Sequence, residues 1–105
     1  MIIATRLLFW ADAFTVNTKL ILVRPEHKDN RALLAHERQH QLQMQQLGVY
    51  YFTWKYLTDR QFRQAMEVEA YKISIACGEN KAFCARYLSE RYWLGINFDE
   101  AMALL

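Results

Sequence analysis

His36-Glu37-Arg38-Gln39-His40 is the stretch from which the organisation of this chain can be worked out. If the segment is helical, the four-residue spacing of the two histidines puts both imidazoles on one face, one turn apart, where they can reach a single metal ion. Glu37 then lies beside the same site, where it can accept a proton from a water molecule that the metal activates. The stretch therefore predicts a helix that carries half a metal site and a general base.

The residues around this stretch predict a capped helix. Asp29 or Asn30 is a suitable N-cap and Gly48 a suitable stop. One set of residues recurs at three- and four-residue steps and is expected to face inward: Leu33, Glu37, His40, Met44 and Leu47. A second set is expected to form a solvated face: Arg38, Gln39, Gln41, Gln43, Gln45 and Gln46.

Upstream of the helix the chain is predicted to form β structure. Thr5–Trp10 and Lys19–Arg24 are short apolar runs, with Asp12 and Asn17 as turn residues between them. Pro25 ends the second run. We expect a small N-terminal β-hairpin or sheet.

Downstream, residues 50–57 form a dense aromatic segment. Packing against the sheet and helices is the favoured interpretation of this segment, and lining of a substrate groove is the alternative. Thr58 and Gln61 fit a capping box, which predicts that a second helix starts there. This helix is expected to run to Cys77, where Gly78 closes it.

A third helix is expected from Asn80 to Leu94 or Gly95, and residues 98–105 are expected to form a short terminal helix. The fold class predicted for residues 1–105 is therefore α+β, as a single domain. It has a small β part followed by three or four helices.

Composition limits the classes of function. Hydrophobic residues make up 53% of the 105 residues, which excludes a disordered tail. The 13 basic and 11 acidic residues give a net charge of +2 without any basic run, so no nucleic-acid partner is expected. No apolar stretch reaches the ~18 residues of a membrane helix, and the N-terminus lacks the basic start of a signal peptide. No membrane partner and a cytoplasmic location are therefore expected.

The chain contains two cysteines, Cys77 and Cys84, which are too few for a disulfide scaffold. Both are expected to be small core residues. No flanking motif supports a thiol enzyme that would use either of them.

A catalytic zinc site needs a third protein ligand. His27 precedes the helix and would have to fold back, so it is expected at the surface. Glu67 and Glu69 lie two residues apart on the second predicted helix, so at most one of them faces the metal. A carboxylate on a largely apolar helix face is costly unless it is paired or ligating, and both faces are apolar enough for this argument. Periodicity alone leaves both residues open.

The stretch from His36 to His40, followed on a later helix by Glu67-Val68-Glu69-Ala70-Tyr71, resembles the gluzincins. In these zinc peptidases the third ligand is a Glu from a downstream helix. Residues 15–23 resemble the turn and strand before the active-site helix. The length and order resemble the minimal members found near phage and injection-system genes, and the resemblance covers roughly residues 13–72.

The resemblance implies a minimal zincin-like domain in which His36, His40 and Glu67 hold Zn²⁺ and Glu37 is the general base. Tyr71 falls where the common form of the family has Asp. This departure leaves the orientation of one imidazole without an explanation. It also implies a catalytic role for the Tyr71 hydroxyl near the metal, as a hydrogen-bond donor or an oxyanion stabiliser.

The function implied by the resemblance is a zinc metallopeptidase that hydrolyses peptide bonds of a peptide or protein substrate. A substrate could add to an exposed edge of the 19–24 strand. A protein partner could complete the cleft, because so short a chain has no second lobe to form its far wall. The alternative is a non-catalytic, zinc-stabilised structural or interaction module of a phage or injection-system particle, and a phage-encoded origin fits either function.

Overall fold

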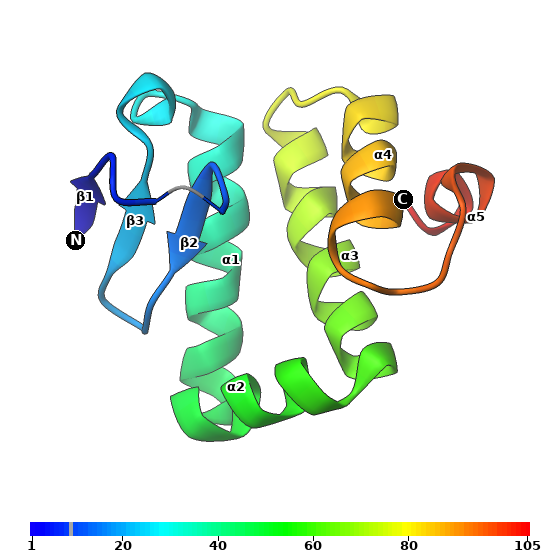
Figure 1. Cartoon of the computed structure of the whole chain (residues 1–105), viewed down its shortest axis with the longest axis horizontal. Coiled ribbons are helices and arrows are strands. Elements are labelled where there is room, and N and C mark those ends of the chain that lie inside the picture. Colours follow the sequence, from blue (N-terminus) through cyan, green and yellow to red (C-terminus); the bar gives the residue numbers. More distant parts are fainter. Residues whose placement is uncertain (9) are drawn as a thin grey trace.

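A computed structural model describes residues 1–8 and 10–105. Three short strands come first and are followed by a 3₁₀ turn and five helices: β1 (Ile2–Ala4), β2 (Ala13–Thr15), β3 (Ile21–Val23), η1 (Pro25–His27), α1 (Arg31–Leu47), α2 (Val49–Thr58), α3 (Arg60–Ala76), α4 (Lys81–Arg91) and α5 (Phe98–Leu104). The sheet lies on one side of α1, and α3 and α4 lie on the other side (Figure 1). At one end, α2 runs from α1 to α3. The predicted α+β class is confirmed. The helix α2, formed by the aromatic segment, is one more than the sequence predicted.

The sheet has the order β1-β3-β2. β1 pairs with β3 in parallel and β2 pairs with β3 antiparallel, with Phe14 and Ile3 both opposite Leu22. The predicted strand around residues 19–24 is confirmed as β3. Because β3 is the central strand, it has no free edge, and the expected strand addition at that edge is wrong.

The strand expected at Thr5–Trp10 is also wrong in position, because the first strand ends at Ala4. The Thr5 N–H donates to the Val23 carbonyl at 2.8 Å, which completes the pairing with β3. The Thr5 hydroxyl then accepts from the Leu7 N–H at 3.1 Å and turns the chain. The part of the prediction that falls on Phe9 lies outside the described residues.

The first helix has the expected ends. The side chain of Asn30 accepts from the Leu33 N–H at 3.1 Å and is the N-cap of α1. Gly48 has a φ of 87°, a conformation that other residues avoid, and this lets α2 start directly after α1.

The expected cap of the next long helix is wrong by one residue. The Thr58 hydroxyl donates to the Trp54 carbonyl at 2.7 Å, so Thr58 belongs to the last turn of α2. Asp59 is the N-cap of α3 instead, and its carboxylate accepts from the Phe62 N–H at 3.1 Å. α3 ends at Ala76 with Cys77 as its C-cap, which agrees with the prediction to within one residue.

The predicted start of α4 at Asn80 is confirmed, but α4 ends at Arg91, before the expected Leu94. Arg63 of α3 donates to the carbonyls of Tyr92 and Trp93 at 2.8 and 3.4 Å. Trp93 has a φ of 50°, which takes the chain out of the helix. The expected terminal helix is present as α5.

The apolar core has two parts. Leu8, Ile21 and Val23 are buried in the N-terminal part of the chain. The larger cluster joins α3, α4 and α5: Tyr71, Cys84, Ala85, Leu88, Leu94 and Ala101. Cys84 is a core residue as expected, whereas Cys77 is exposed because it caps the C-terminal end of α3. Within the described part of the chain, no helix is long and apolar enough to cross a bilayer.

Candidate metal centre

The two histidines of α1 face the same point. They lie one turn apart on the buried side of the helix, and their Nε2 atoms are 3.2 Å apart. His36 and His40 are only 4% and 7% exposed. The helical spacing therefore brings the imidazoles together as the sequence predicted.

The third group comes from α3, which packs along α1. Glu67 Oε1 lies 3.0 Å from His36 Nε2 and 3.2 Å from His40 Nε2. Glu67 shares the buried face of α3 with Ala70, Tyr71 and Ser74, as the periodicity indicated. The structure thus brings together the three residues that the resemblance named as ligands, 27 positions apart in the case of His40 and Glu67.

The dimensions of this triangle fit a zinc ion. A tetrahedral zinc that is bound at ~2.0–2.1 Å holds neighbouring ligand atoms roughly 3.3 Å apart. The three donor atoms lie 3.0, 3.2 and 3.2 Å from one another. Two imidazole nitrogens and one carboxylate oxygen are also a donor set that zinc uses in proteins.

Charge reinforces the cluster. Burial alone disfavours a charged imidazole, but Glu67 outweighs this effect and raises the pKa of His40 to about 9. Burial likewise acts to raise the pKa of Glu67, and His40 and His36 outweigh it, so the pKa of this carboxyl falls well below its usual value. Without a metal, Glu67 is therefore a buried carboxylate paired with a histidine cation.

Glu67 is held by a second contact that the sequence did not reveal. The Tyr56 hydroxyl of α2 donates to Glu67 Oε2, which leaves Oε1 directed at the imidazoles. Burial and the charge of Glu67 raise the pKa of Tyr56, so its hydroxyl stays protonated and remains a donor.

His40 is also held from outside the triangle. Gln43 Oε1 lies 2.8 Å from His40 Nδ1, on the side of the ring away from Glu67. Gln43 is 2% exposed, so its expected place on the solvated face of α1 is wrong. The spacing of 36, 40 and 43 could have revealed this, because residues i, i+4 and i+7 share one face of a helix.

Glu37 lies on the same buried side of α1 and is 7% exposed. The Thr15 hydroxyl of β2 donates to Glu37 Oε2 at 2.6 Å and also lies 3.0 Å from the Glu37 carbonyl. This contact fixes one carboxylate oxygen and leaves the other available. The role of Thr15 has no signal in the sequence, because it depends on how the sheet packs against α1.

Tyr71 lies beside the cluster but its hydroxyl is engaged elsewhere. Its ring stands edge-on to that of His36, with 4.3 Å between the centroids. Its hydroxyl bonds with that of Tyr92 at 2.6 Å. His36 Nδ1 is buried and has no hydrogen-bond partner among the described residues. Among the described tyrosines, the hydroxyl that bonds to a residue of the triangle is that of Tyr56, whereas the Tyr71 hydroxyl bonds to Tyr92.

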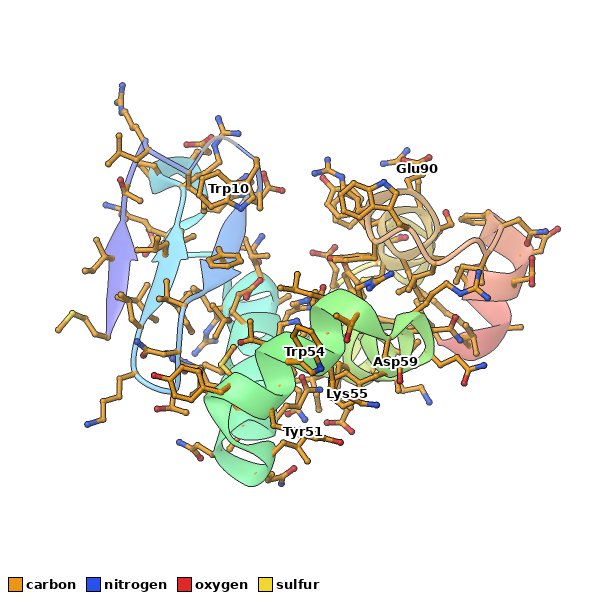
Figure 2. The ribbon with its side chains drawn as sticks, turned by 60° about the horizontal axis from the view of Figure 1, so that its bottom comes forward. Trp10, Tyr51, Trp54, Lys55, Asp59 and Glu90 are labelled. Carbon is orange, nitrogen blue, oxygen red and sulfur yellow. The ribbon has the colours of Figure 1, made fainter. Side chains whose placement is uncertain are left out.

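The triangle lies in the wall of a cavity of about 700 Å³. One side comes from β2 and α1 and the other from α3, α4 and the segment after α4, with Tyr92 and Trp93 among the lining residues. α2 contributes Phe52, Thr53, Tyr56 and Leu57. One face of the aromatic segment packs against α1 and α3, which was the favoured interpretation, and also lines the cavity. The other face exposes Tyr51 and Trp54 (Figure 2).

Other candidates named from the sequence are not part of the triangle. Glu69 is exposed and accepts from the side chains of Gln39 and Gln43. His27 is also outside the triangle, and its Nε2 lies 3.5 Å from Asp12 Oδ1. Burial raises the pKa of the Cys84 thiol to about 11, which is unfavourable for a thiolate nucleophile.

Comparison with known proteins gives a match to a protein family. Residues 7–48 are similar to the family model of the eCIS core domain, the core of extracellular contractile injection systems. The match spans less than half of the chain, covers β2, β3 and α1 with His36 and His40, and ends before Glu67. It supports the expected association with injection systems and is not a match to a peptidase family. Neither the curated proteins nor the solved structures give a match to the chain.

Proposed function

We propose that this chain is a zinc-binding component of an injection-system particle, with the ion held by His36, His40 and Glu67. The observation that carries the metal site is the triangle of buried donor atoms at 3.0 to 3.2 Å. The association with an injection system is supported by the match of residues 7–48 to the eCIS core domain.

The donor set favours zinc among the common protein metals. Magnesium and calcium prefer oxygen ligands, whereas two of the three donors here are imidazole nitrogens. A ligand set of two neutral imidazoles and one carboxylate also suits a buried site, because the ion would offset the charge of Glu67. Metal binding to such residues is coupled to folding, so zinc would stabilise the packing of α1 against α3.

Peptide hydrolysis is the second candidate function. Structural zinc sites are closed by four protein ligands, whereas catalytic sites have three and keep one position open. The described residues supply three, beside a carboxylate at Glu37 and a cavity of about 700 Å³. The family match favours a particle component more directly than it favours a peptidase, so hydrolysis rests on this geometry alone.

For hydrolysis, each residue would have a distinct task. Zinc, when bound, supplies Lewis acidity and makes a water molecule acidic enough to be a nucleophile at neutral pH. Glu37 would accept the proton of that water and deliver it to the leaving amine, with Thr15 holding its second oxygen in place. Tyr71, next to His36, would need to release Tyr92 before its hydroxyl could reach a substrate.

A peptide substrate could add to β2 rather than to β3. Arg24 N–H donates to the Asp12 carbonyl and Val16 N–H to the Leu20 carbonyl, both at 2.9 Å. In an antiparallel pair, the backbone N–H and C=O groups of successive residues point alternately toward the partner strand and away from it. Because Asp12 and Val16 bond to the residues that flank β3, Ala13 and Thr15 direct their backbone groups away from β3. Both residues line the cavity, so an added strand would pass along it.

One experiment tests both candidates. The chain is reconstituted with zinc, its metal content is measured, and cleavage of a peptide library is followed for wild type, Glu37→Gln and the control Glu90→Gln. Glu90 is exposed on α4 (Figure 2), so its variant should match wild type in both measurements. A hydrolase should keep one zinc per chain in Glu37→Gln and lose cleavage.

The outcomes separate the two functions. Wild type with zinc and without cleavage would leave the non-catalytic component and reject the peptidase. Reconstituted wild type without zinc would reject the metal site itself.

A further inference from the structure

Gln43 is a buried polar residue that neither proposed function uses. It lies on α1, one turn beyond His40, and is 2% exposed. An amide buried this deeply is costly unless its oxygen and its two N–H groups all find partners. All three groups of Gln43 do.

The partners of Gln43 fix the direction of its amide. Its Nε2 lies 3.1 Å from the Met66 carbonyl and 3.1 Å from Glu69 Oε1, and both of these groups can only accept. The NH₂ end must therefore point at α3. Its Oε1 then lies 2.8 Å from His40 Nδ1 and can only accept, so Nδ1 must carry a proton.

A proton on Nδ1 has a consequence for the other ring nitrogen. In an imidazole that binds a metal ion only one nitrogen carries a proton, so a proton on Nδ1 leaves Nε2 with the lone pair for the ion. This is the atom that faces His36 and Glu67. The exposed Glu69 helps to orient the Gln43 amide, because its carboxylate accepts hydrogen bonds from Gln43 and from Gln39.

We infer that Gln43, oriented by the Met66 carbonyl and by Glu69, is a positioning residue that fixes the tautomer and the direction of His40 for metal binding. The inference rests on the proposed metal site and adds how this chain orients one ligand of the ion. It explains the orientation of His40, whereas Nδ1 of His36, beside Tyr71, has no hydrogen-bond partner among the described residues. Groups that orient a ligand histidine typically change metal affinity by about 10–100-fold when they are removed.

The test compares Gln43→Met with the matched control Gln46→Met. Both remove an amide from α1, but Gln46 is exposed and has no contact with the triangle. Zinc affinity is measured by competition with a chelator, and the His40 Nδ1 proton is observed by NMR in the zinc-loaded protein. We expect Gln43→Met to bind zinc about 10–100-fold more weakly and to lose the slow exchange of that proton, while Gln46→Met matches wild type in both measurements.

Unchanged zinc affinity and an unchanged His40 proton in a folded Gln43→Met protein would overturn the inference and leave the metal site intact. If wild type binds no zinc, the metal site and the inference fail together. Should Gln43→Met not fold, Glu69→Ala removes one acceptor of the Gln43 amide from an exposed position. A several-fold loss of affinity in Glu69→Ala supports the inference, and wild-type affinity contradicts it.

Discussion

Replacing Glu67 by Gln tests the choice of the third ligand. The substitution keeps the size of the side chain and removes its charge, and Glu69→Gln is the matched control two residues away on the exposed side of α3. Structural zinc sites release about 10–16 kcal/mol on binding, which is roughly 2.5–4 kcal/mol for each of four ligands. Because ~1.4 kcal/mol is a factor of ten, loss of Glu67 as a ligand should weaken binding by roughly 10²–10³-fold.

A second effect of the same substitution acts in the opposite direction. Glu67 is the chief cause of the raised pKa of His40, about 9, although burial opposes it. At pH 7.5 a pKa of about 9 means that zinc must displace a proton at a cost of about 30-fold in affinity. Glu67→Gln removes most of the competition between zinc and the His40 proton. The net loss of zinc affinity should therefore be small at pH 7.5 and should reach its full size near pH 9.5.

The assay is chelator competition at both pH values. We expect the zinc affinity of Glu67→Gln to fall at least ~10²-fold near pH 9.5. The zinc affinity of Glu69→Gln should stay within a few-fold of wild type, because the Gln oxygen at position 69 can still accept from Gln43. A larger loss in Glu69→Gln than in Glu67→Gln would refute the ligand assignment.

Three further predictions concern the groups around the triangle. Tyr56→Phe removes the donor to Glu67 Oε2 and should lower zinc affinity by up to ~10-fold, measured by the same competition. Zinc affinity of wild type should rise about tenfold per pH unit from pH 7 to 9 and then level off, because His40, with a pKa near 9, must lose its proton to bind the ion. If the chain hydrolyses peptides, Thr15→Val should lower kcat by freeing the Glu37 carboxylate while zinc content stays at one per chain.

Controls for these predictions come from the same chain. Tyr50→Phe changes a tyrosine of α2 that is 92% exposed, and Thr18→Val changes a threonine outside the cavity wall. Both should match wild type. A pH-independent affinity between pH 7 and 9 would contradict the ion pair between His40 and Glu67.

Local signals in the sequence were sufficient for the helices other than α2 and for part of the site. The caps at Asn30 and Asn80 use side chains that bond to nearby backbone groups, so neighbouring residues decide them. The pairing of His36 with His40 follows from the helical period. Glu67 could be placed on one face with Ala70, Tyr71 and Ser74, and all four are buried.

The remaining features depend on contacts between distant segments. Glu67 and Glu69 both lie on α3, and only the rotation of α3 against α1 decides which of them is buried. Gln43 is buried because the backbone of α3 offers the Met66 carbonyl as a partner. The sheet has strands of three residues, too short for a periodic signal, and the parallel pairing of β1 with β3 joins residues about nineteen positions apart, such as Ile2 and Ile21.

The most direct test of the central claim is anomalous scattering at the zinc edge from crystals of the zinc-supplemented protein. The account predicts one peak about 2.0–2.2 Å from His36 Nε2, His40 Nε2 and Glu67 Oε1. A peak coordinated by Glu69, or the absence of any peak at the triangle, would contradict it.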